Sequence, residues 1–223
     1  FDQYVTKIGE MAVLYRNRIP RNLPLRAVIR GGVRSCSITS AKAGPGAADA
    51  ESHHQEESMD TYQCIVSKRD TRSYLDQPIE EEKLRRVLQA GRMAGSSKNT
   101  QPVRLVVLRE RKRREEVASC AKFAQHLPAA AAGIAICAPS TGSELAAGRA
   151  AQNMMLAAWS MGIASCPCSM HDQPCVKEVL GLPEDYRVVV VLALGYPDPA
   201  APMSLGRKRL ELDEFVREGR WEE

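Results

Sequence analysis

After residue 58, segments with helical periodicity alternate with short β-branched runs, and this alternation most constrains the fold. The helices that we predict span residues 79–94, 143–161 and 176–180. The strands that we predict span residues 103–108, 133–138 and 187–194. Helices interleaved with three or four strands, without an internal repeat, predict a single α+β domain.

The segment 143–161 is the most apolar of the predicted helices. Its apolar side chains occupy nearly the whole circumference and include Met154, Met155, Leu156 and Trp159. A helix that is apolar on all sides is usually buried. We therefore expect a central or interface helix, with its methionines serving as packing.

Residues 1–58 differ from the rest because they contain no periodic stretch. Between Met11 and Lys42 there is no acidic residue, but there are six arginines, namely Arg16, Arg18, Arg21, Arg26, Arg30 and Arg34. This composition resembles an organelle transit peptide. The alternative is a leader, with Met59 as the natural start. Both interpretations predict a disordered segment 1–58 and a folded domain 59–223.

The net charge is small, because 31 Lys and Arg residues against 27 Asp and Glu residues give +4. No apolar run approaches the ~18 residues of a membrane span. We therefore expect neither a nucleic-acid partner nor a membrane partner. The seven cysteines are an odd number in a chain large enough to fold without covalent staples. A disulfide framework is thus not expected, and a reducing compartment such as the cytoplasm is, with an organelle as the alternative.

Two polar segments could bind a ligand. Residues 68–72, Lys-Arg-Asp-Thr-Arg, place three cations and one acid within five positions. Such a cluster could bind a phosphate, although a solvated basic turn is the alternative. Residues 94–102 offer hydroxyls, amides and a lysine between a predicted helix and a predicted strand. This mixture suits a polar heteroaromatic ligand, and an ordinary helix exit is the alternative.

Taken in order, these segments resemble the nitroreductase family of FMN-dependent oxidoreductases, from about Cys64 to Phe215. The matching segments are KRDTRSY, IEEEKLRRVLQAGRMA, GSSKNTQP, AAQNMMLAAWSMGIASC, VLGLPEDYRVVVVLALGYP and GRKRL. The resemblance implies a central mixed sheet flanked by helices, with a buried dimer-interface helix. It also implies FMN as cofactor, NADH or NADPH as electron donor, and a homodimer with two flavins at the shared interface.

The resemblance implies a set of residues at the flavin. Around the phosphate and ribityl chain it places Lys68, Arg69, Asp70 and Arg72, joined by the late pair Arg207 and Arg209. Near the ribityl chain or the ring it places Ser97, Asn99 and Gln101, and along the ring the loop that holds Pro167, Cys168 and Ser169.

Three positions depart from the family pattern. Gly95 replaces a usual proline and Val103 a common tryptophan, which implies a looser wall of the site. Asp70 stands where many members have serine, and an aspartate there also occurs in the flavin-consuming branch that makes dimethylbenzimidazole. An acid beside a phosphate must face the ribityl hydroxyls or pair with Arg72.

The segment CPCSMHDQPC places Cys166, Cys168, His171 and Cys175 within ten residues. This is a soft ligand set, but the intervals of one, two and three residues do not match the usual pairs of a structural zinc site. We expect no metal there. A flavin-facing loop with incidental thiols and a group of redox-sensitive cysteines remain open, and His171 is either a surface residue or a proton donor.

The function that the resemblance implies is hydride transfer from NAD(P)H through bound FMN to a small-molecule acceptor of the nitroaromatic or quinone type. One alternative is an FMN-fragmenting or dehalogenating relative. Another is a non-catalytic flavin-binding redox sensor. The sequence offers no support for a hydrolase or a kinase. It contains no Ser, His and Asp set, no paired carboxylates and no glycine-rich phosphate loop at a spacing typical of these enzymes.

Overall fold

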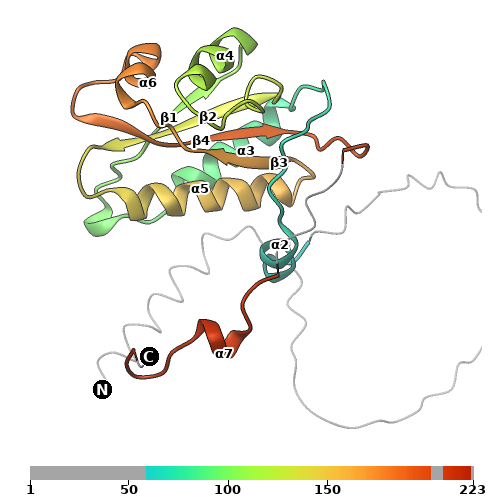
Figure 1. Ribbon diagram of the computed structural model, residues 1–223, viewed down its shortest axis with the longest axis vertical. Coiled ribbons are helices and arrows are strands. Elements are labelled where there is room, and N and C mark those ends of the chain that lie inside the picture. Colours follow the sequence, from blue (N-terminus) through green and yellow to red (C-terminus); the bar gives the residue numbers. More distant parts are fainter. Residues whose placement is uncertain (1–58, 202–207, 222–223) are drawn as a thin grey trace, which may run out of the picture. The chain divides into compact units, whose positions relative to one another are not determined.

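The computed structural model describes residues 59–201 and 208–221 (Figure 1). Its helices are α2 (Thr61–Ser67), α3 (Glu81–Arg92), α4 (Arg111–Ser119), α5 (Glu144–Trp159), α6 (Gln173–Leu180) and α7 (Leu212–Phe215), with one 3-10 turn, η1 (Ser97–Asn99). Its strands are β1 (Arg104–Leu108), β2 (Ala132–Pro139), β3 (Ala164–Cys168) and β4 (Tyr186–Gly195). The predicted α+β class is confirmed.

The four strands form one antiparallel sheet in the order β1-β2-β4-β3 (Figure 1). The expected mixed sheet is therefore wrong for these strands, and parallel pairing occurs in an isolated bridge between Asp70 and Ser165. We did not predict β3, because its sequence ASCPC contains no β-branched residue. Pro167 fits there because β3 is an edge strand, where a missing N–H is tolerated.

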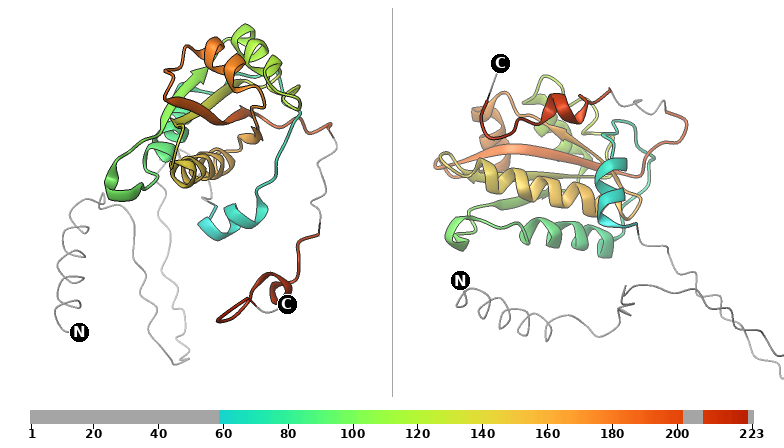
Figure 2. Two further views of the ribbon diagram at one scale, coloured as in Figure 1. Left: turned by 60° about the vertical axis from the view of Figure 1, so that its left-hand side comes forward. Right: turned by 90° about the horizontal axis from the view of Figure 1, so that it is seen from below.

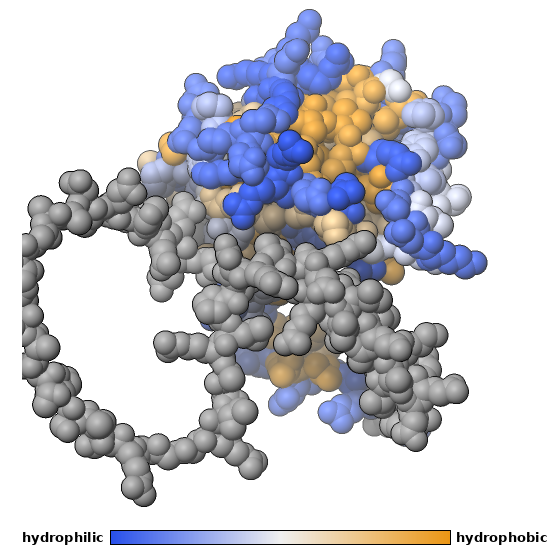
Figure 3. All heavy atoms as spheres, turned by 180° about the vertical axis from the view of Figure 1, so that it is seen from behind, coloured by the Kyte–Doolittle hydropathy of each residue, from blue (hydrophilic) through white to orange (hydrophobic). Residues whose placement is uncertain are grey.

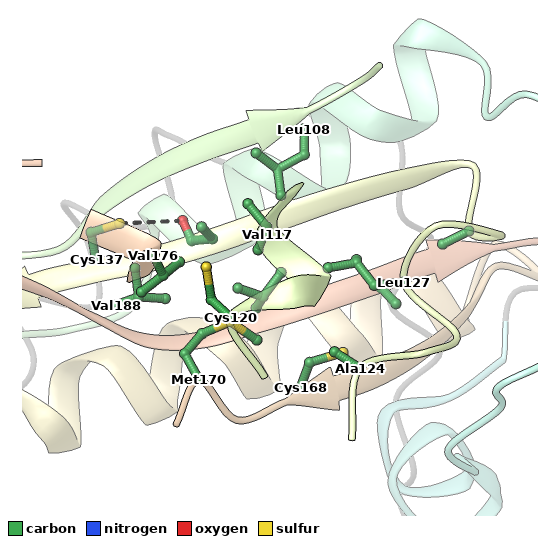
Figure 4. Close-up of a cluster of buried hydrophobic side chains, with 14 residues drawn as sticks. Leu108, Val117, Cys120, Ala124, Leu127, Cys137, Cys168, Met170, Val176 and Val188 are labelled. Atoms are coloured by element: carbon green, nitrogen blue, oxygen red, sulfur yellow. Dashed lines mark hydrogen bonds between the residues drawn. The ribbon is translucent and has the colours of Figure 1, made fainter. Parts of the chain in front are cut away.

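Helices cover both faces of the sheet. Helices α3 and α5 lie side by side on one face, and α4 and α6 cover the other (Figures 1 and 2). Successive strand residues point to opposite faces. In β2, Ile134 and Ile136 accordingly belong to the core under α3 and α5, whereas Ala135 and Cys137 belong to the core under α4 and α6. Figure 4 shows the second core, where side chains of α4 meet the sheet.

The predicted helix 79–94 is confirmed as α3, shortened at both ends. Glu81 and Glu82 lie in its first turn, where carboxylates suit the helix dipole. Gly91 permits close packing on α5, because a Cβ atom there would lie 2.8 Å from the Cγ atom of Met154. Met154 is fully buried, as expected for a packing residue.

The predicted central helix is α5, which is buried toward the sheet and α3. Helix α2 packs on its C-terminal half, where the Cys64 thiol donates to the Leu156 carbonyl at 3.2 Å and the Trp159 indole donates to the Ser67 hydroxyl at 3.0 Å. Leu145, in the first turn of α5, is 78% exposed. A role of α5 in a dimer stays a prediction.

Within the described ranges, no helix combines the length and the apolar character that crossing a membrane requires. The predicted disordered segment 1–58 lies outside the described residues, as does Arg207.

Candidate flavin site

A hollow of about 490 Å³ lies at the β3 edge of the sheet. Its lining residues are Arg72, Phe123, Gln125, His126, Pro167, Cys168, Ser169 and His171. They come from the segment after α2, the α4–β2 connection, the end of β3 and the β3–α6 connection. The structure thus brings together four residues that the resemblance assigns to the flavin, namely Arg72, Pro167, Cys168 and Ser169.

The segment that carries Arg72 is held against the sheet by its backbone. Asp70 forms a parallel bridge with Ser165, and the Thr71 amide donates to the Ser165 carbonyl at 3.1 Å. The Tyr74 hydroxyl donates to the Thr71 carbonyl at 2.6 Å. The Tyr74 ring lies over Gly195, where a Cβ atom would come within 2.9 Å of it. Tyr74 and Gly195 together therefore fix the backbone next to Arg72.

The basic cluster separates into groups with different partners. The Lys68 ammonium pairs with the Asp70 carboxylate, and only 11% of the Lys68 side chain is exposed. The Arg69 guanidinium donates to the carbonyls of Val66 and Lys68, both at 2.9 Å, so it caps the end of α2. Arg72 alone of this cluster lines the hollow. Asp70 thus pairs with Lys68 and not with Arg72. This ion pair explains an aspartate at position 70 without any role in flavin cleavage.

Cys168 and His126 form a pair in the wall of the hollow, with 3.2 Å between the thiol sulfur and the imidazole Nε2. Burial raises the pKa of the Cys168 thiol to about 12, and neighbouring Cys166 adds to the effect. Burial, followed by the charge of Arg72, lowers the pKa of His126. Near neutral pH the pair is therefore an uncharged thiol and an uncharged imidazole, which does not form a nucleophilic thiolate.

A disulfide between Cys120 and Cys175 joins the start of the α4–β2 connection to the first turn of α6, which follows the β3–α6 connection. Our expectation of no disulfides is wrong at this pair, because α4 and α6 cover the same face of the sheet and bring the two Cα atoms to 5.6 Å. Beyond the disulfide, the Phe123 and His171 rings meet edge to face at 5.7 Å. Within the described residues no group of three or more potential ligands could hold a metal ion.

The loop 95–102 borders a second, smaller cavity of about 160 Å³. Gln101 lines it, whereas Ser97 and Asn99 lie in the exposed turn η1. The loop is conformationally strained, because Lys98, Asn99 and Gln101 all have a positive φ, at 48°, 54° and 49°. Such strain in non-glycine residues persists only where the surroundings impose it and is concentrated at functional sites.

The hollow and the cavity lie on opposite faces and at opposite edges of the sheet. Cys168 of the hollow belongs to the core under α4 and α6, at the β3 edge. The cavity lies between α3 and α5 and includes Leu105 of β1, the other edge strand. Arg72 and Gln101 therefore line separate surfaces of one protomer.

Sequence reasoning missed Phe123, Gln125 and His126 as site residues. They lie in an irregular connection between α4 and β2, where no periodicity marks which side chains face inward. Only an unusual density of polar and aromatic residues in KFAQH could have drawn attention to it. Arg209 is exposed and Arg207 is not described, so their approach to the phosphate stays a prediction.

Comparisons with known proteins identify relatives across most of the chain. The model of the family described as "Nitroreductase family" matches residues 65–140 and 138–196. A relative from Archaeoglobus fulgidus, named as an NADH dehydrogenase/NAD(P)H nitroreductase, is 30% identical over 165 residues, which cover 69% of this chain and 95% of the relative. The NADPH-flavin oxidoreductase of Vibrio harveyi is 28% identical over 73% of this chain and 75% of its own length.

Solved structures agree with the sequence relatives. The NADPH:FMN oxidoreductase of Vibrio harveyi, solved in complex with NAD⁺, matches with a TM-score of 0.66 over 73% of this chain and 78% of that chain, at 28% identity. Nitroreductase A of Vibrio parahaemolyticus matches with a TM-score of 0.67 over 74% of this chain and 78% of that chain, at 29% identity. The chain belongs to the nitroreductase family.

Proposed function

We propose that this chain is an FMN-dependent oxidoreductase that passes reducing equivalents from NAD(P)H to a nitroaromatic or quinone-type acceptor, with its flavin in the 490 Å³ hollow. Family membership supports the enzyme class, the cofactor and the NAD(P)H donor. The proposed location of the flavin rests on one observation, namely that Arg72 and the end of β3 line the same hollow. FMN supplies two-electron chemistry that protein side chains lack.

The residues of the hollow fit a phosphate-bearing aromatic group. Arg72 has no carboxylate partner among the described ion pairs, and guanidinium binds phosphate well. Pro167 and Ser169 are exposed at the end of an edge strand, so a flat ring can approach the backbone there. We infer that Arg72 binds the phosphate and that the segment 167–169 supports the ring.

The wall opposite β3 suits a planar substrate. Phe123 is 74% exposed although it borders the hollow, and its ring is oriented by His171. The uncharged pair formed by Cys168 of β3 and His126 of this wall leaves the hollow without an ion pair that would compete for Arg72. These residues would bind the nicotinamide and then the acceptor, and neither Cys168 nor His126 needs to form a covalent bond.

The separation of the two cavities supports a homodimer. We propose that loop 95–102 of one protomer completes the flavin site of its partner, because the loop lies at the opposite edge of the sheet from the hollow of its own protomer. Helix α2 presents large apolar side chains to solvent, with Tyr62 69% and Ile65 51% exposed. Apolar surface also gathers among polar side chains on the face seen in Figure 3. Surfaces of this kind favour self-association.

Cofactor identification and rapid kinetics test the proposal. The flavin released by heat should be FMN, and mixing the loaded protein with NADH or NADPH should bleach the flavin absorbance rapidly. Addition of a nitroaromatic or a quinone should restore that absorbance. Recovery of FAD would contradict the cofactor assignment, and flavin that neither nucleotide bleaches would favour a flavin-binding sensor or a relative with another reaction.

A further inference from the structure

Two wall segments of the hollow, residues 120–126 and residues 169–175, are joined by the disulfide between Cys120 and Cys175. Cys120 is the C-cap residue of α4, and Cys175 lies in the first turn of α6, so both ends of this bond are anchored in helices. Phe123 follows Cys120 closely and His171 precedes Cys175 closely, and both line the hollow. The disulfide therefore fixes the distance between the two wall segments beside the hollow.

The noncovalent contacts that the structure shows between the two wall segments are weak by comparison. The Asp172 amide donates to the Cys120 carbonyl at 3.1 Å, and the Lys122 amide donates to Nδ1 of His171 at 3.4 Å. The ring of Phe123 meets the ring of His171 only edge to face, and 74% of Phe123 is exposed. Two hydrogen bonds and one ring contact stabilise far less than a covalent bond. The closed position of the wall thus depends on the disulfide.

Cys175 is the cysteine that a reductant reaches first in the part of the chain that the structure describes. It is half-buried, whereas every other described cysteine is at most 5% exposed, namely Cys64, Cys120, Cys137, Cys166 and Cys168. The Cys120 side chain belongs to the buried cluster of Figure 4. Its sulfur lies 3.6 Å from the Glu116 carbonyl, which can accept a hydrogen bond from a Cys120 thiol. Attack at the Cys175 sulfur, with Cys120 as the leaving group, is therefore the accessible route of reduction.

We propose that the bond between Cys120 and Cys175 is a reversible redox site that controls the hollow. A thiolate of a dithiol reductant attacks the Cys175 sulfur, the S–S bond breaks, and Cys120 leaves as a thiolate and takes up a proton. The second thiol of the reductant then displaces Cys175 from the mixed disulfide. The reductant is oxidised to a disulfide, and the protein gains two electrons and two protons as two thiols. A small disulfide such as oxidised glutathione reverses the exchange.

Reduction opens the wall and weakens flavin binding. Once the sulfur atoms separate, the segment that carries Phe123 moves away from the segment that carries His171, and the hollow widens. A flavin in the hollow then loses contacts with both segments. This consequence rests on the proposed function, which places the flavin there. Because binding and reduction are linked, FMN must in turn stabilise the disulfide by the same factor.

FMN affinity in the two redox states of the full chain tests the proposal. Fluorescence titration should give a dissociation constant about tenfold higher after reduction with dithiothreitol, and oxidised glutathione should restore the original value. Cys175→Ser should bind FMN at the weaker level with and without reductant. Cys64→Ser, which replaces a free and buried thiol of α2, is the matched control and should keep the full redox response.

The redox equilibrium gives a second measurement that does not depend on a variant. The protein is equilibrated in mixtures of reduced and oxidised dithiothreitol, its thiols are alkylated, and the peptide that carries Cys175 is quantified by mass spectrometry. A tenfold change in FMN affinity requires the disulfide of the FMN-loaded protein to have a midpoint potential about 30 mV lower than that of the flavin-free protein. Equal potentials would overturn the proposal, as would equal FMN affinity of the two redox states.

Hydrogen exchange distinguishes an opened wall from an unfolded chain. On reduction, amide exchange should become faster in residues 120–126 and 169–175 and stay unchanged in α3, which lies on the other face of the sheet. Faster exchange throughout α3 would overturn the proposal, because the disulfide would then only stabilise the fold. If neither redox state binds FMN, the proposed function fails, and exchange confined to the two wall segments would still support redox control of the wall.

Discussion

Arg72 and Arg69 are close in the sequence, but their guanidinium groups lie in different surroundings. Arg72 lines the hollow, whereas Arg69 caps α2 through the carbonyls of Val66 and Lys68. We expect Arg72→Ala to weaken FMN binding roughly tenfold or more, since a charge-assisted contact to a phosphate contributes about 1.5–3 kcal/mol. Arg69→Ala should lower thermal stability and change FMN affinity less. Flavin fluorescence titration of both variants separates these roles, and equal loss of affinity would contradict the distinction.

His126 predicts a dependence of stability on pH. Its pKa is lowered from the ordinary value of 6.5 because burial and Arg72 both disfavour the imidazolium. The unfolded chain therefore binds more protons than the native chain below about pH 6.5, and the free energy of unfolding must fall as the pH drops through that range. His126→Gln should flatten this decline. Urea unfolding at several pH values between about 5 and 8 measures it, and parallel curves for the two proteins would refute the assignment.

The outcome at individual residues shows what a sequence pattern can and cannot predict. The resemblance predicts that Arg72 and the segment 167–169 lie at the same site, because both belong to the ordered set of motifs that matches the family. The Lys68–Asp70 pair was not predicted, since a cluster of mixed charges has several possible pairings. His126 was not predicted because its role depends on the distance to Cys168, which lies 42 positions away in the sequence.

The disulfide between α4 and α6 predicts a link between oxidation and stability. It closes a loop of 55 residues, for which the chain-entropy estimate is about 4 kcal/mol, although measured values are commonly about 2–4 kcal/mol. Cys175→Ser should therefore lower the thermal midpoint and loosen the wall at Phe123 and His171. Calorimetry with and without reductant tests this, and the Cys64→Ser variant serves as a control because that thiol is free. A wild-type midpoint that reductant does not change would contradict the prediction.

The elements differ in how far the sequence predicts them. Strands β1, β2 and β4 contain apolar runs that include β-branched residues and are bounded by turns, so local pattern was sufficient. Strand β3 has no such run and exists through its ladder with β4, which is a tertiary contact. The antiparallel direction and the disulfide likewise depend on how helices and strands pack, which single-sequence periodicity does not encode.

At the scale of the whole molecule, the two cavities are the feature that a single protomer does not explain. The strained loop 95–102 matches the family motif, yet it borders the β1 edge, whereas Arg72 lies at the β3 edge. Three spacings of about 4.8 Å separate the edge strands, and the sheet itself lies between the two faces. Two copies of the chain allow the loop of one protomer to reach the hollow of the other, and they would create two equivalent sites.

Subunit complementation tests this arrangement directly. Arg72→Ala and Asn99→Ala should each weaken FMN binding as homodimers, because every site then lacks one contact. If each site is built from both chains, a mixed dimer of the two variants has two different sites. One site carries both substitutions, and the other carries neither. Random pairing of equal amounts should therefore restore tight binding to about a quarter of all sites. Coexpression with two affinity tags isolates the mixed dimer, in which half of the sites should retain FMN as tightly as the wild type. If both contacts came from one protomer, every site would keep one defect and no tight-binding fraction would appear.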